Sequence, residues 1–88
     1  MNMPLPVVVT VQDEFDSPLP GATVQVQVAG VPHIASTDET GRAEFSLDVG
    51  TYPFTVMLEG FVPVSSSLEV RDGTRNATVV ALEPAVIE

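Results

Sequence analysis

The chain has 88 residues, 44% of them hydrophobic, which is enough for one small domain with a core and disfavours disorder. Twelve acidic residues against three arginines, with no lysine, give a formal charge of −9, which disfavours nucleic acid and anionic membranes as partners. The lack of cysteine and lysine excludes disulfides, thiolate metal sites, Schiff-base chemistry and phosphate-loop nucleotide binding.

Residues 1–6 are predicted to form an extended arm punctuated by proline. They contain no basic stretch ahead of an apolar run, so we expect no signal peptide and favour a virion or cytoplasmic assembly over classical secretion. No apolar run approaches the roughly 20 residues needed to span a bilayer. From Val7 onward apolar and polar residues alternate, which predicts a first strand over 7–12.

A loop over 13–21 contains two prolines and ends at Gly21. The alternation over 22–28 predicts a half-buried strand. A short third strand over 33–37 follows Gly30 and Pro32, and a proline beside so short a run is typical of a sheet edge.

The stretch from 37 to 52 carries the clearest signals. Asp38 and Gly41 begin and end a predicted turn, and Gly41 can adopt a positive φ without a Cβ clash. Alternation over 43–49, the break at Gly50 and renewed alternation over 52–58 predict a hairpin of the fourth and fifth strands. The aromatic side chains at inward positions of these strands are Phe45, Tyr52 and Phe54.

The last two strands are predicted over 61–70 and 76–82, joined through the turn signal Asp72-Gly73. The strand over 76–82 is apolar on both faces, which indicates a strand that is buried on two faces or covered by a neighbour. Seven short strands predict an all-β fold, a seven-stranded antiparallel β-sandwich. The domain spans 1–88, with the sandwich over 7–82 and a C-terminal tail over 83–88.

Four short motifs occur in order at characteristic intervals: Pro18-Leu19-Pro20-Gly21-Ala22-x-Val24, Thr37-Asp38-x-x-Gly41-Arg42-x-x-Phe45, Gly50-Thr51-Tyr52 and Gly60-Phe61. Over about residues 7–82 the chain resembles the carboxypeptidase regulatory-like domain, a transthyretin-like (prealbumin-like) sandwich. The resemblance implies an accessory, adhesive or assembly module, and some relatives bind carbohydrate. Its motifs are structural and carry little information about activity.

Two patterns that resemble a catalytic triad and a glycosylation site are better explained as ordinary structural residues. A triad of His33, Ser36 and Asp38 is disfavoured because residues three apart on a strand point to opposite faces. Asn76 begins a glycosylation sequon but is interpreted as a turn residue that enters a strand. We therefore expect no enzymatic activity.

The loops after the first, third and fifth strands should share one end of the sandwich, where six carboxylates would face only Arg42. Such a pole repels itself unless solvent, cations or a basic protein partner screens it, and most acidic loop ends are simply solvated. Oxygen ligands on loops also suit Ca²⁺, for which the candidate ligands are Asp13, Asp16, Asp38 and Glu39.

Exposed apolar residues usually find a partner. The candidate interface residues are Met3, Leu5, Phe15, Val79, Val86 and Ile87. We expect a structural or accessory module that mediates protein–protein assembly in a larger homo- or hetero-assembly, such as a decoration or tail component of a virus particle or secretion apparatus. The alternative is a ligand-binding module that recognises glycan or Ca²⁺ through the acidic loops.

Overall fold

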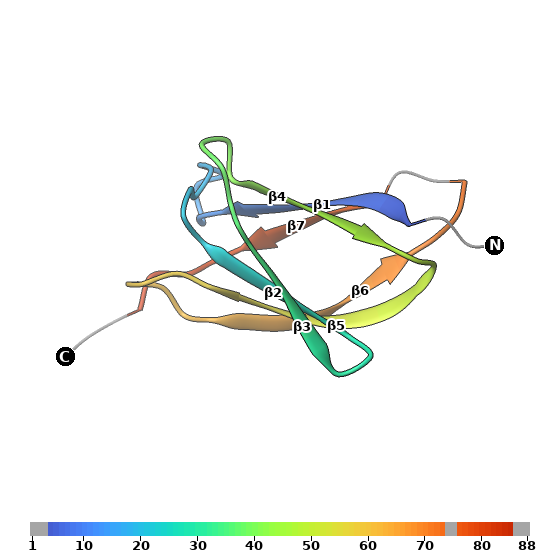
Figure 1. The fold of residues 1–88 in the computed structure, drawn as a ribbon. Coiled ribbons are helices and arrows are strands. Elements are labelled where there is room, and N and C mark those ends of the chain that lie inside the picture. Colours follow the sequence, from blue (N-terminus) through green and yellow to red (C-terminus); the bar gives the residue numbers. More distant parts are fainter. Residues whose placement is uncertain (1–3, 74–75, 86–88) are drawn as a thin grey trace.

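The protein is a two-layer β-sandwich in a computed structural model that describes residues 4–73 and 76–85 (Figure 1). Its strands are β1 (Leu5–Gln12), β2 (Thr23–Val28), β3 (Val31–Ser36), β4 (Arg42–Leu47), β5 (Gly50–Met57), β6 (Val64–Val70) and β7 (Asn76–Ala81). One sheet has the order β4-β1-β7 and the other the order β3-β2-β5-β6. The predicted seven-stranded sandwich is confirmed.

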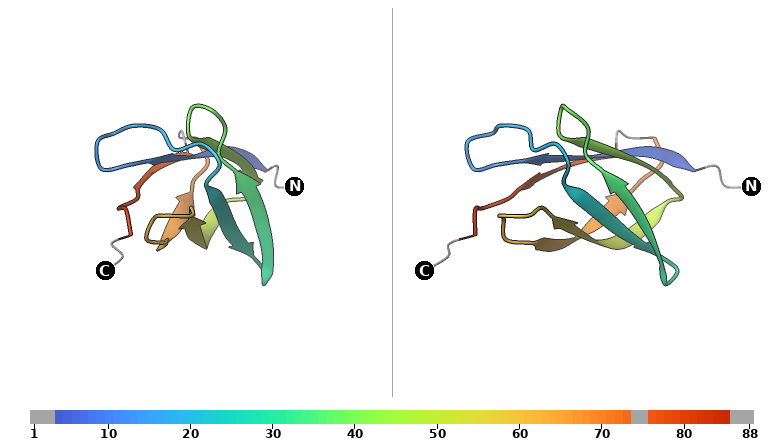
Figure 2. Two further views of the ribbon diagram at one scale, coloured as in Figure 1. Left: turned by 90° about the vertical axis from the view of Figure 1, so that its left-hand side faces the viewer. Right: turned by 60° about the vertical axis from the view of Figure 1, so that its left-hand side comes forward.

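The core lies between the two sheets, which form separate layers when the molecule is turned (Figure 2). Apart from the edge strand β3, each strand sends alternate side chains inward, as a period of two requires. Fully buried examples are Val7, Val9 and Val11 on β1, Val24 and Val26 on β2, and Val56 on β5. Phe54 is buried, and Phe45 and Tyr52 are half-buried against the same cluster, so the inward positions predicted for the aromatic residues are confirmed.

The pairing of β1 with β7 corrects the expectation of a wholly antiparallel sandwich. These strands run parallel, with Val7 beside Asn76 and Gln12 beside Ala81. All other strand pairs are antiparallel. Parallel pairing is possible here because β1 and β7 are separated by nearly the whole chain, which leaves ample length for a crossover.

The predicted hairpin of 43–49 with 52–58 is wrong. β4 pairs with β1 in the three-stranded sheet, whereas β5 pairs with β2 and β6 in the other sheet. The chain changes sheets at Asp48–Val49, between the two strands. Alternation assigns each strand one buried face, but two strands that face each other across a core carry the same pattern as two that pair side by side.

The prediction that β3 is an edge strand is confirmed. β3 pairs only with β2, and Ala35 is its one half-buried residue, whereas the other five are exposed. Ala29 and Gly30 link β2 to β3 with φ values of 50° and 81°, the two positive angles of a type I′ turn. Pro53 on the central strand β5 lies one residue beyond the last β2–β5 pair, so its missing N–H breaks no ladder bond with β2.

Two strand boundaries differ from those predicted. β1 begins at Leu5, within the predicted arm, because Leu5 and Pro6 continue the pairing with β4. β6 begins only at Val64, and Phe61 instead forms an isolated bridge with Pro84. The described part of the chain contains no helix that is long and apolar enough to cross a membrane.

Candidate functional site

The connections β1–β2, β3–β4 and β5–β6 meet at one end of the sandwich, as predicted. The Gly21 N–H donates to the Thr37 carbonyl over 3.0 Å, which joins the first two connections. The Val62 N–H donates to the Glu83 carbonyl over 2.9 Å, so the segment after β7 lies beside the third. In Figure 1 these loops gather on the side towards which the arrows of β1 and β7 point.

Two of the sequence motifs form the corner of this end. The buried hydroxyl of Thr37 accepts a hydrogen bond from the Ala22 N–H over 2.9 Å and donates one to the Leu19 carbonyl over 2.6 Å. Gly41 has a φ of 78°, and a Cβ placed on it would lie 2.6 Å from the Val11 carbonyl oxygen. The corner therefore requires a hydroxyl at Thr37 and the absence of a side chain at Gly41.

We call the acidic residues of this end the acidic pole. They are Asp13, Glu14, Asp16, Asp38, Glu39, Glu59 and Glu83. Glu83 was missed by the sequence analysis, although the segment after a seventh strand falls at the same end as the loops after the first, third and fifth. Among the described residues, Arg42 at the start of β4 is the basic residue closest in sequence to the acidic pole.

The Asp13 carboxylate braces the β1–β2 loop. Its Oδ1 accepts hydrogen bonds from the Phe15 N–H over 2.8 Å and the Ser17 N–H over 2.9 Å. Asp16, at a φ of 64°, accepts a hydrogen bond from Gln12 Nε2 over 2.9 Å. These bonds hold the tip of the loop in one shape, with 77% of the Phe15 surface exposed to solvent.

The Asp38 carboxylate plays the same part in the β3–β4 turn. Its Oδ1 accepts hydrogen bonds from the Thr40 hydroxyl over 2.6 Å, the Thr40 N–H over 2.8 Å and the Arg42 N–H over 3.1 Å. These bonds, that of the Thr40 hydroxyl above all, hold the pKa of Asp38 below its ordinary value because they favour the charged form.

Three of the four candidate Ca²⁺ ligands therefore have separate local tasks. Asp13, Asp16 and Asp38 each use a carboxylate oxygen to order their own loop. Glu39 is exposed beside Asp38. Within residues 4–73 and 76–85, no three His, Cys, Asp or Glu side chains are grouped closely enough to hold a metal ion.

The candidate interface residues divide into three kinds. Phe15 and Val79 are exposed, by 77% and 64%, whereas Leu5 is half-buried against the core. Met3, Val86 and Ile87 lie outside the described residues. Val79 and its neighbours Ala77 and Ala81 form the apolar outward side of β7, which no other strand of the sandwich covers.

The structure agrees with the two sequence-based exclusions. On β3, His33 pairs with Val26 and Ser36 with Thr23, so their side chains lie on opposite sides of the strand. The Asn76 side chain is buried at 8% exposure and its amide is hydrogen-bonded to the backbone of Arg71 at both ends. It is therefore a structural residue that closes the β6–β7 connection.

The comparisons with known proteins agree with the fold. The model of the carboxypeptidase regulatory-like domain matches residues 6–83, and no curated protein matches the sequence. The TIE protein of Bacillus anthracis aligns with a TM-score of 0.79 at 20% identity, over 94% of this chain and 17% of that one. A streptococcal ancillary pilin aligns with a TM-score of 0.66 at 20% identity, over 97% and 30%.

An enzyme also has this fold. The 3-chlorocatechol 1,2-dioxygenase of Rhodococcus opacus 1CP aligns with a TM-score of 0.77 at 11% identity, over 97% of this chain and 61% of that one. The chain spans less than two thirds of each of these three proteins, and at such identities the likeness concerns the fold alone. The match over residues 6–83 is of a different kind, because it covers nearly the whole sequence: the chain belongs to the carboxypeptidase regulatory-like domain family.

Proposed function

We propose that the chain is a non-enzymatic structural module that mediates protein–protein assembly, as an accessory part of a virus particle, a secretion apparatus or a surface filament. The family match to a regulatory-like domain supports this role, and so does the likeness of its fold to that of an ancillary pilin. The observation that carries the proposal is the exposure of Phe15 on a braced loop.

Phe15 has the properties of an interface anchor. A large aromatic side chain contributes strongly to binding when a partner's pocket removes it from water. The hydrogen bonds of Asp13 fix the backbone on both sides of Phe15, so little conformational entropy is lost on docking. The neighbouring Glu14 and Asp16 favour a partner whose apolar pocket has a basic rim.

The surface grooves support a role without catalysis. Three grooves on the described surface are each lined by a single charged side chain, which is Arg42, Glu59 or Glu44. General acid–base and nucleophilic mechanisms need at least two groups that converge on one substrate atom. None of these grooves offers such a pair.

The acidic pole favours the alternative function, a glycan- or Ca²⁺-binding module. One experiment distinguishes the two functions. A photo-reactive benzoylphenylalanine replaces Phe15 in the full chain, expressed in the cells that produce it, with Ser67 as the exposed control position on β6. We expect one discrete protein adduct from position 15 and none from position 67. We also expect no change in the melting temperature with Ca²⁺ or with soluble glycans. A rise in melting temperature without an adduct would favour the alternative.

A further inference from the structure

The outer side of the three-stranded sheet is an uncovered face, which we call the β1 face. Its residues alternate with the buried ones and are Pro6, Val8, Thr10 and Gln12 on β1, Arg42, Glu44 and Ser46 on β4, and Ala77, Val79 and Ala81 on β7. The β1 and β7 part of this face carries no charged side chain. Val79, on the edge strand β7, is 64% exposed.

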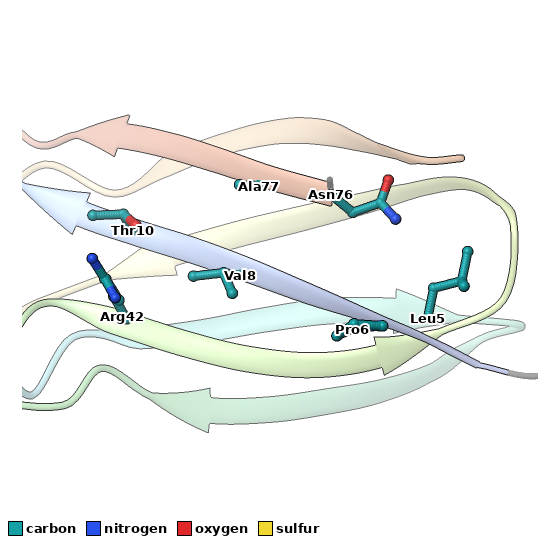
Figure 3. A pocket seen from close by; sticks show the side chains of 7 residues that line it. All are labelled: Leu5, Pro6, Val8, Thr10, Arg42, Asn76 and Ala77. Carbon is teal, nitrogen blue, oxygen red and sulfur yellow. The ribbon is translucent and has the colours of Figure 1, made fainter. Parts of the chain in front are cut away.

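This face has both a hollow and a projection. A groove of about 560 Å³ is lined by Leu5, Pro6, Val8, Thr10, Arg42, Asn76 and Ala77 (Figure 3). Val79 follows Ala77 on the same side of β7 and stands beside the groove. A projection and a hollow on one surface are what an isologous interface requires, because each copy presents both halves of the contact.

The charges of the β1 face are also self-complementary. Its only charged residues among those described are Arg42 and Glu44, two positions apart on the same side of β4. Among the described residues the one ion pair joins Arg71 to Glu69. The Arg42 guanidinium therefore makes no ion pair with a described carboxylate. The face is thus neutral on a chain of formal charge −9, and a second copy can approach it without strong repulsion.

The strand register places these features in two rows across the sheet. One row is Glu44, Val8 and Ala77, and the next is Arg42, Thr10 and Val79. A two-fold axis that runs across the strands between the rows exchanges them. Each Arg42 then lies over Glu44 of the second copy, and each Val79 lies over Ala77 at the edge of the groove.

We propose that two copies of the chain associate through their β1 faces about this axis. The inference deepens the proposed assembly function and rests on it, since it names the partner of one surface as a second copy. Three short strands form a small face compared with the roughly 800 Å² per partner of a stable complex. We therefore expect a weak dimer, which forms where an assembly holds copies at high local concentration.

Charge exchange tests the pairing in the full chain. Sedimentation over about two decades of concentration should show a dimer for the wild type. Arg42→Glu and Glu44→Arg should each weaken it by about tenfold or more, because each makes the paired positions alike in charge. An equimolar mixture of the two variants should dimerise again, since an all-acidic face then meets an all-basic one.

Arg71→Glu and Glu39→Arg serve as matched controls. They change the net charge by the same amounts away from the β1 face, and each should dimerise like the wild type, alone and mixed. A wild type that stays monomeric, or single variants that dimerise undiminished, would overturn the proposal. So would a mixture that fails to recover. The cross-link at position 15 reports on the acidic pole and is independent of these outcomes, so the two proposals can fail separately.

Discussion

The side-chain amide of Asn76 pairs with both backbone groups of Arg71. It donates from Nδ2 to the Arg71 carbonyl over 3.0 Å and accepts from the Arg71 N–H over 2.9 Å. One side chain thus satisfies the backbone just beyond the end of β6 and fixes the start of β7, next to β1. The asparagine of the glycosylation sequon thus has a structural role, in which its side chain is engaged by the backbone of Arg71.

Replacement of Asn76 by aspartate should destabilise the fold by about 1–3 kcal/mol, because a carboxylate keeps the acceptor but opposes the Arg71 carbonyl with a second oxygen. Urea unfolding of the variant measures the loss. Ser67→Ala, an exposed change on β6, should leave the midpoint within error of the wild type. Equal midpoints for Asn76→Asp and Ser67→Ala would contradict the proposed role of the amide.

Gly41 and Gly60 provide a matched pair. Both have a positive φ, but an added Cβ at Gly60 meets nothing within 4 Å, whereas at Gly41 it lies 2.6 Å from the Val11 carbonyl oxygen. We expect Gly60→Ala to cost about 1 kcal/mol from backbone strain alone, and Gly41→Ala to cost more than about 2 kcal/mol because the corner must also move. Chemical denaturation of both variants checks this order, which an equal loss would refute.

Ala29 is an improvable position. It holds a φ of 50° in the β2–β3 turn, where most side chains are strained but asparagine is tolerated because its short amide can hydrogen-bond to the nearby backbone. Ala29→Asn should raise the free energy of unfolding by about 0.5–1 kcal/mol. The thermal midpoint reports the gain. Ala81→Asn, at an exposed position within β7, is the control and should not stabilise the fold.

Acid should weaken the fold partly through Asp38. Its pKa is lower in the folded chain than in the unfolded chain, so its contribution to stability is present above its unfolded pKa and is lost as the pH falls through the folded value. Below about pH 4 the free energy of unfolding should therefore fall less steeply in Asp38→Asn than in the wild type.

The Thr40 hydroxyl separates this effect from general acid denaturation. Thr40→Val removes the strongest hydrogen bond to the Asp38 carboxylate and should raise the pKa of Asp38, whereas Thr40→Ser retains the donor and should leave it low. NMR titration of the Asp38 side chain measures both. An unchanged titration in Thr40→Val would show that the backbone N–H groups suffice.

The sequence predicted the layers better than their connections. Period-2 alternation identified the inward side chains of Val9 and Phe54 because burial on one face of a strand leaves a local pattern. It could not show that β4 and β5 lie in different sheets, or that β1 and β7 run parallel, since pairing partners are set by contacts between distant segments.

The same distinction applies to the candidate site. The gathering of the acidic loops was predictable, because odd-numbered strands of a sandwich end on one side and the carboxylates follow those strands. The bracing of Phe15 by Asp13 depends on the exact loop conformation. The placement of Arg42 and Glu44 beside an uncharged strip depends on the register of three strands, which no local pattern reveals.

The position of β1 between β4 and β7 also sets the order in which the chain can fold. During synthesis β1 must wait for its partner β7, whose paired residues emerge 69 positions later. Until then the edge of β1 that faces β7 has no neighbouring strand to pair with. Nascent chains held short of β7 should therefore be the species that chaperones bind, and release should coincide with the emergence of residues 76–81.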